Sequence, residues 1–254
     1  ATLKYDHSRG AMVYQTPMRQ GRSPNRGLCA QPCRLPFDLV GENGVRLQPA
    51  SRERALCTHD NCVIDDLAAL AAAGVASLKL EGRMKPAAYV WAVTSAYRAA
   101  LDALARGERD VPLAVRRTLK RSFNRGLTDA YLQGTSGNEL MSYERSGNRG
   151  ELVGELVSFE PEPGFVPRDG QQIRGTVTLA LAVSVGAGDS LELRPVDDPE
   201  RFMVVLAPGP CEAGGMLRCR VPRPMPAGCE VRLTRSVALL DAAARAVSEL
   251  EREL

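Results

Sequence analysis

Cysteine thiols stand beside cations and carboxylates in the first third of this sequence. Cys29 and Cys33 fall in the basic run 25–34, and Cys62 opens the acidic run 62–66. Thiolates gathered with charged residues in this way are more typical of an iron–sulfur or metal site than of a packed core. A cluster usually takes four ligands, and these two runs offer three. Three buried structural thiols are the alternative.

A second set of reactive side chains, Glu81, Arg83 and Lys85, directly follows the mostly apolar segment Val75–Leu80. Its length and composition predict a short strand. In α/β proteins reactive groups collect where strands end and loops begin. We therefore expect these three residues to be catalytic, with a salt-bridged surface loop as the alternative.

Helical patterns flank the predicted strand. Apolar residues recur on one face of 63–73, where Gly74 supplies a stop, and a longer pattern runs from Pro86 toward Gly107. The order helix–strand–helix is typical of an α/β barrel or an open parallel sheet.

A basic segment, 116–126, predicts a helix that ends at Gly126. Cations on one helix can contact RNA phosphates, although a solvated charged face is the plainer interpretation. The RNA-binding candidates in this segment are Arg116, Arg117, Lys120, Arg121 and Arg125.

Composition limits the class of protein. The chain has 254 residues, enough for two domains, with 25% charged and 44% apolar residues. No apolar run is long enough for a membrane span, and the first residues do not resemble a signal peptide. Seven irregularly spaced cysteines favour reduced thiols and a cytoplasmic location. Only two histidines are present, which leaves little material for a Ser-His-Asp site.

Charge is unevenly distributed along the chain. Residues 1–150 carry 22 Lys/Arg against 14 Asp/Glu, a surplus of 8, and residues 151–254 carry 11 against 16, a deficit of 5. A basic first half favours a polyanionic partner such as RNA, with a solvated basic surface as the alternative.

Beyond Gly150 the pattern changes to short strands separated by Gly and Pro, which predicts a small β-barrel or sandwich. An amphipathic helix follows over 236–254, with Ser236 as its cap. Cys211, Cys219 and Cys229 lie on no ligand spacing and are expected to be buried thiols. The predicted strands are 152–159, 176–185, 190–195, 203–207, 216–221 and 230–234.

With these segments placed, the chain resembles the peptidase U32 family of collagenase-like proteins. The resemblance rests on the runs 21–36, 62–67, 77–85 and 123–128, together with Tyr97-Arg98 and Leu101-Asp102. It implies an α/β fold: the later half of a TIM-type barrel, then a small β-barrel or sandwich domain and a C-terminal helix. The expected divisions are 1–110, 111–150 and 151–254.

The resemblance also implies an activity. Similar proteins hydroxylate RNA, at the tRNA wobble uridine or a 23S rRNA cytidine, and others hydroxylate ubiquinone as a heterodimer. These proteins hold a 4Fe–4S cluster, and prephenate is implicated as the hydroxyl source in the tRNA reaction. Carried over here, Cys29, Cys33 and Cys62 would hold the cluster, and Arg26 and Arg34 would bind an anionic co-substrate.

Two departures from the family pattern bear on this expectation. We expect the chain to open at the later half of the barrel. Asp6 and Val13 stand where two upstream family cysteines fall, and Cys57 is the candidate stand-in ligand. A fragment, a degenerate copy or a subunit whose protein partner completes the barrel is therefore expected. Two alternatives stay open: a peptidase using Cys29 or Cys57 with His59, or a metal site, and a non-catalytic RNA-binding module.

Overall fold

The computed structural model describes residues 2–6, 11–15, 31–47, 54–82, 85–135, 137–166, 168, 172–198 and 201–253. Its contacts divide the chain into two units. Unit 1 comprises Ala1–Thr58 and Met141–Ser146, and unit 2 comprises His59–Leu140 and Gly147–Leu254. The predicted boundaries at 110 and 150 stay a prediction.

Unit 1 is built from short elements. Strands β1 (Thr2–Asp6) and β2 (Ala11–Gln15) pair antiparallel, and η2 (Pro32–Arg34) is one turn of 3₁₀ helix. A turn follows: the Gly44 N–H donates to the Gly41 carbonyl at 2.9 Å, and an antiparallel bridge joins Val40 to Arg46.

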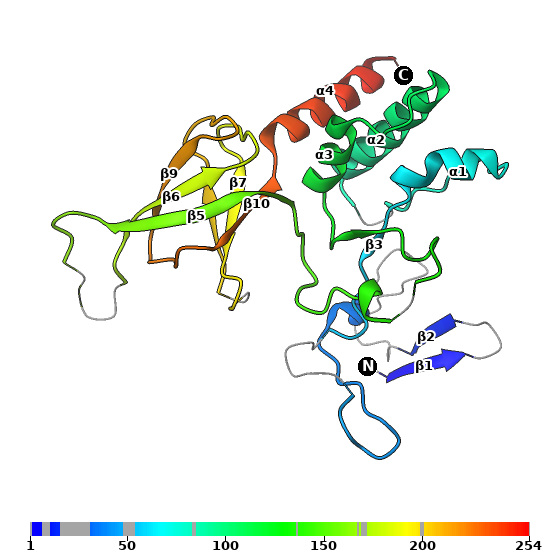
Figure 1. Ribbon diagram of the computed structural model, residues 1–254, viewed down its shortest axis with the longest axis horizontal. Coiled ribbons are helices and arrows are strands. Elements are labelled where there is room, and N and C mark those ends of the chain that lie inside the picture. The colour runs from blue at the N-terminus through cyan, green and yellow to red at the C-terminus, as the bar shows by residue number, and fades with distance from the viewer. Residues whose placement is uncertain are drawn as a thin grey trace. The chain divides into compact units, whose positions relative to one another are not determined.

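The helices of unit 2 match the sequence patterns closely (Figure 1). Helix η3 (Ile64–Asp66) continues into α1 (Leu67–Ala72), and Gly74 ends it with a positive φ of 84°. Helix α2 (Ala87–Ala105) begins directly after Pro86, whose fixed φ suits a helix start. Their shared apolar cluster, with α3 (Leu113–Arg121), contains Ile64, Leu67, Ala96, Tyr97, Ala100, Val115 and Leu119.

Two local predictions were wrong. The segment Val75–Leu80 is extended but forms no strand, because it has no ladder partner among the described residues. The basic helix ends at Arg121 instead of Gly126: Ser122 has an extended backbone, and the Asn124 side chain donates to the Lys120 carbonyl at 2.9 Å.

A TIM-type barrel is not confirmed, although the chain is a mixed α/β protein. Within the described ranges the only parallel strand pair is β3 (Asp60–Asn61) with β4 (Leu127–Thr128), two residues each. This pair brings the start of the acidic run next to the segment that follows α3. It therefore sets the position of Cys62 relative to the loop at Phe123.

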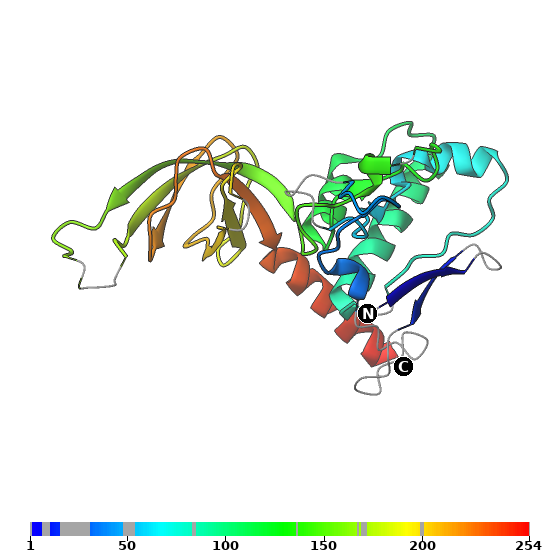
Figure 2. The same ribbon diagram turned by 90° about the horizontal axis from the view of Figure 1, so that it is seen from below.

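The second part of unit 2 is a curled antiparallel sheet (Figure 2). The strand order is β8-β7-β10-β5-β6-β9, and edge strands β8 and β9 contact each other. Alternating burial along β9 places Leu217, Cys219 and Val221 in the core. The strands are β5 (Glu151–Pro161), β6 (Gly175–Leu181), β7 (Ser190–Arg194), β8 (Met203–Leu206), β9 (Met216–Val221) and β10 (Glu230–Arg235).

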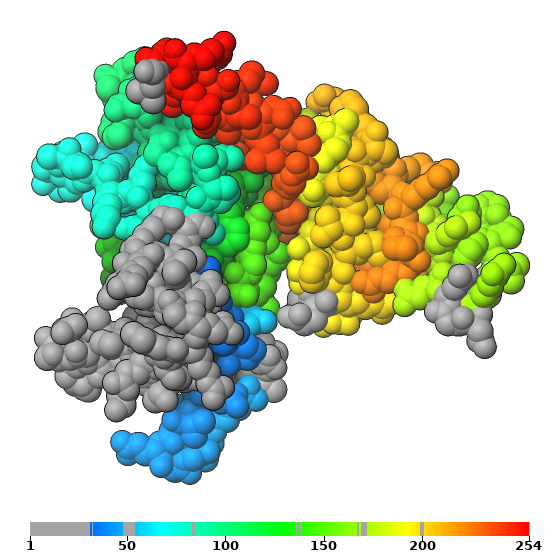
Figure 3. All heavy atoms as spheres, turned by 180° about the vertical axis from the view of Figure 1, so that it is seen from behind, coloured from blue at the N-terminus to red at the C-terminus, as the bar shows by residue number. Residues whose placement is uncertain are grey.

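Helix α4 (Val237–Glu253) leaves the sheet and packs along α2 (Figures 1 and 3). Its start has two caps. Ser236 Oγ accepts from the Leu239 N–H at 3.5 Å, as predicted, and Asp189 Oδ1 accepts from the Val237 N–H at 2.8 Å. In the described part of the chain no helix is long and apolar enough to cross a membrane.

The cysteines of the sheet domain were predicted to be buried thiols. This is confirmed for Cys219 and Cys229, which are almost fully buried, whereas Cys211 is only partly buried.

Candidate functional site

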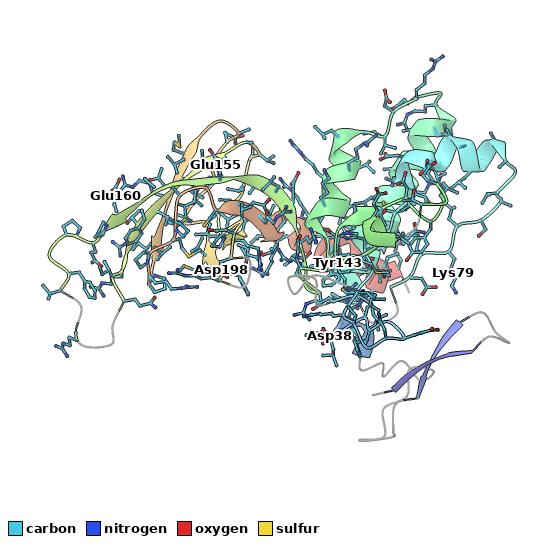
Figure 4. All side chains as sticks on the ribbon, turned by 60° about the horizontal axis from the view of Figure 1, so that its bottom comes forward. Asp38, Lys79, Tyr143, Glu155, Glu160 and Asp198 are labelled. Atoms are coloured by element: carbon cyan, nitrogen blue, oxygen red, sulfur yellow. The ribbon has the colours of Figure 1, made fainter. Side chains whose placement is uncertain are left out.

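A pocket of about 280 Å³ in unit 2 contains both a predicted cluster ligand, Cys62, and a predicted catalytic residue, Glu81. Six segments form it: β3 with the two residues after it, the segment after α1, helix α2, helix α3, the loop after α3 and strand β4. Lys79, labelled in Figure 4, also lines it from the extended segment. Its other polar and aromatic members are Asp60, Asn61, Tyr89, Tyr97, Ser122 and Phe123.

The Cys62 thiol is half-buried and held by helix α2. The Tyr97 hydroxyl donates to Cys62 Sγ at 3.7 Å, and the same hydroxyl oxygen accepts the Val63 N–H at 3.2 Å. Burial raises the pKa of Cys62, while hydrogen bonds from the Ile64 backbone and from Tyr97 oppose the rise. The free thiol is therefore neutral at neutral pH, and the donors around it would stabilise a thiolate once a positive ion binds.

An ion pair and three cation–π contacts border the pocket, the longest of them between Lys85 Nζ and the Tyr89 ring, 5.6 Å from its centroid. Arg125 Nη1 lies 3.0 Å from Asp60 Oδ1, and the Arg125 N–H donates to the other carboxylate oxygen at 2.7 Å. Lys85 Nζ lies 2.9 Å from the centroid of the Phe123 ring, and the Arg125 guanidinium lies 4.6 Å from it. Two of the predicted functional cations thus meet at one aromatic wall.

The predicted catalytic set is brought together in part. Glu81 is exposed, lines the pocket and pairs with Lys79 at 3.0 Å. Lys85 does not line the pocket, but it lies over the ring of Phe123, which does. Arg83 lies outside the described residues. Their catalytic role stays a prediction.

Most of the predicted RNA-binding cations form ion pairs. Arg116 pairs with Asp65 at 2.9 Å, and Arg121 and Arg117 both approach the buried Glu151, at 2.6 and 3.5 Å. Lys120, by contrast, is exposed and forms no ion pair in the described part of the chain. It lines a second cavity of about 290 Å³ that also touches Cys62 and contains Arg116.

The other predicted cluster ligands belong to unit 1 or lie outside the description. Cys33 is half-buried in η2, and the next residue, Arg34, donates from Nη1 to Cys57 Sγ at 3.3 Å and to the Thr58 carbonyl at 3.1 Å. Arg26 and Cys29 are not among the described residues.

Within those residues, no three His, Cys, Asp or Glu side chains are grouped so that they could hold a metal ion. The cluster assigned to Cys29, Cys33 and Cys62 stays a prediction, since Cys29 lies outside the described residues.

Sequence reasoning did not select four of the residues that line the pocket: Asp60, Asn61, Tyr89 and Tyr97. The two tyrosines fall in the helical pattern after Pro86, where Tyr97 was noted only as part of the family resemblance. Asp60 and Asn61 directly precede the run that begins at Cys62. The available signal was their spacing, since residues eight apart on a helix share one face.

Comparison with known proteins decides the family. The chain matches peptidase family U32 over residues 6–142, more than half of its length. It belongs to that family. No solved structure matched the chain.

U32 relatives carry names from two kinds of activity. The chain is 36% identical, over 57% of its length, to a 23S rRNA 5-hydroxycytidine synthase of Escherichia coli, and 28% identical, over 57%, to a tRNA hydroxylation protein of Bacillus subtilis. It is 33% identical, over 44%, to a collagenase of Porphyromonas gingivalis. These alignments cover only 23%, 36% and 31% of the three relatives.

Proposed function

We propose that this U32 protein takes part in the hydroxylation of a pyrimidine in tRNA or rRNA. The observation that carries the proposal is the 36% identity to an rRNA 5-hydroxycytidine synthase over more than half of the chain. The pocket adds support, because it places a cysteine, a carboxylate and aromatic rings around one cavity.

Each predicted residue takes a role in this proposal. A 4Fe–4S cluster on Cys29, Cys33 and Cys62, with a further ligand, would supply redox chemistry that side chains lack. Prephenate, held by Arg26 and Arg34, would be the source of the hydroxyl group. Glu81, Arg83 and Lys85 would line the reaction site, and the cations of 116–125 would contact the RNA backbone. The RNA makes the cytoplasm the expected compartment.

Nucleoside analysis tests the activity directly. A strain lacking the gene would be compared with strains that carry the gene or its Cys62→Ser variant, and RNA nucleosides would be measured by mass spectrometry. We expect one pyrimidine nucleoside to gain an oxygen atom only with the unchanged gene. Identical nucleoside profiles in all three strains would contradict the proposal.

Anaerobic purification tests the cofactor. We expect iron, acid-labile sulfide and a visible absorption band in the purified protein, all reduced by Cys62→Ser. A colourless protein that still binds RNA would favour the non-catalytic RNA-binding module.

A peptidase is the second candidate, and the relative named as a collagenase favours it. The one described histidine, His59, has its Nδ1 atom 2.7 Å from the Arg125 carbonyl oxygen, so that nitrogen is already engaged. Peptide cleavage that is lost in Cys29→Ser or Cys57→Ser and retained in Cys219→Ser would support this candidate over RNA hydroxylation.

A further inference from the structure

The pocket at Cys62 has a size and a lining that suit one small planar ring. At about 280 Å³ it lies just below the range of roughly 300–1,000 Å³ usual for pockets that bind drug-sized ligands. Three aromatic side chains line it: Tyr89 and Tyr97 from α2, and Phe123 from the loop after α3. Aromatic walls around a small cavity favour a flat, unsaturated ligand, because such a ligand can stack on them.

We propose that this pocket holds a single pyrimidine base turned out of the RNA strand, with its ring beside Cys62, the residue that would also bind the cluster. The inference rests on the proposed function. An enzyme that modifies ring atoms of a base must remove the base from its stack, because neighbouring bases hide those atoms. Unstacked RNA bases are commonly held on aromatic side chains.

The three rings differ in how free their faces are. Tyr97 is 8% exposed, and its hydroxyl is bonded to Cys62 and Val63. Phe123 already receives Lys85 and Arg125 on its ring. Tyr89 is half-buried, and the one cation over its ring, Lys85 Nζ, lies 5.6 Å from the centroid, farther than either cation lies from the Phe123 centroid. Tyr89 is therefore assigned as the stacking surface for the base, and Phe123 with its two cations as a positively charged wall.

Asn61 is assigned as the residue that reads the edge of the base. It is exposed, it lines the pocket, and its amide makes no hydrogen bond to another described residue. A carboxamide offers both a donor and an acceptor, which matches the mixed edge of cytosine or uracil. Its neighbour Asp60 is held by Arg125, which fixes the strand that carries Asn61.

A fluorescence experiment on the full chain tests the inference. The probe is a short single-stranded oligoribonucleotide carrying one pyrrolocytidine, whose emission changes when it leaves the stack, and an end label reports total RNA binding by anisotropy. The variants are Tyr89→Leu, which keeps an apolar side chain without a ring, and Asn61→Ala. The control is Tyr131→Leu, which removes an exposed tyrosine that does not line this pocket.

We expect the emission to change with the unmodified chain and with Tyr131→Leu. Tyr89→Leu should weaken the emission response about 10-fold, the usual range for the loss of one stacked base. Asn61→Ala should lower the preference for pyrrolocytidine over a purine analogue.

Suppose that all the proteins bind RNA and that Tyr89→Leu gives the same emission response as the unmodified chain. That result would overturn the base pocket and leave the proposed function standing. No RNA binding by any of the proteins would overturn both.

Discussion

At the scale of single residues, the cysteines of this chain fall into distinct environments. Cys62 lies in a pocket against a tyrosine hydroxyl, and Cys57 is fully buried with an arginine donor. Cys219 and Cys229 are buried in the apolar core of the sheet. Burial without charged partners raises the pKa of Cys219 to about 11. Sequence spacing could separate the sheet cysteines from the others but could not show that Cys57 is inaccessible.

Thiol reactivity should follow these environments. In the native protein at mildly alkaline pH, iodoacetamide should label Cys33 and Cys211 first, because both are partly exposed. Cys62 should react more slowly, because burial raises its pKa and lowers its thiolate fraction. Cys57, Cys219 and Cys229 should react only after unfolding. Peptide mass spectrometry reads each site, and rapid native labelling of Cys219 would contradict the sheet core.

Removing the charge of Arg121 should lower stability. Its partner Glu151 is 6% exposed in its side chain and would keep only the longer contact with Arg117. We expect Arg121→Met to lower the free energy of unfolding by about 3 kcal/mol, the usual cost of breaking a buried pair. Urea unfolding followed by circular dichroism measures this.

The matched control is Lys120→Met, one residue earlier and exposed, which should change the free energy of unfolding by less than about 0.5 kcal/mol. Equal losses in both variants would show that the pair with Glu151 is not important for stability.

At the scale of elements, the sequence predicted best what local chemistry decides. All six strands of the sheet and the helix after Pro86 were located within a few residues, except the end of β6, because alternation, turn residues and proline act locally. The prediction of a strand over Val75–Leu80 was wrong, because a strand needs a distant partner that its own residues do not specify. The Asp189 cap was missed for the same reason: it lies 48 residues from the helix start.

Gly150 sets the entry into β5 and should tolerate no side chain. It has a φ of +62°, and a Cβ there would lie 2.2 Å from the Leu233 carbonyl oxygen on β10. Gly164 has a similar φ of +73° with nothing within 4 Å.

We expect Gly164→Ala to cost about 1 kcal/mol for the left-handed backbone alone. Gly150→Ala should cost about 1–3 kcal/mol more, because β10 must shift. Thermal unfolding of the two variants measures the difference, and equal costs would mean that the strand adjusts freely.

At the scale of the whole molecule, charge counted along the sequence overstates the charge available for RNA. The 22 Lys/Arg of residues 1–150 include cations that the fold pairs with carboxylates, among them Arg116, Arg121 and Arg125. The pocket shows the same limit. Its members come from six segments, and only the fold could bring Cys62 to Glu81 and to the tyrosines of α2.

Lys120 should therefore contribute more to the salt dependence of RNA binding than the paired cations of the same helix do. Each phosphate contact to a single strand contributes about −0.7 to the slope of log K against log salt. Because Lys120 is exposed and forms no ion pair among the described residues, we expect Lys120→Gln to reduce the slope by about 0.7. Fluorescence anisotropy across a salt series measures the slope.

The control for that slope is Arg98→Gln, which removes the same charge from α2. Arg98 pairs with Asp102 at 2.7 Å, and its side chain is 64% exposed, so the substitution should leave the fold intact. If the RNA follows the basic helix, the slope should change only for Lys120→Gln, because counterion release counts contacts instead of net charge. An equal change in both variants would mean that RNA binding responds only to overall charge. That outcome would contradict the contact assigned to the basic helix.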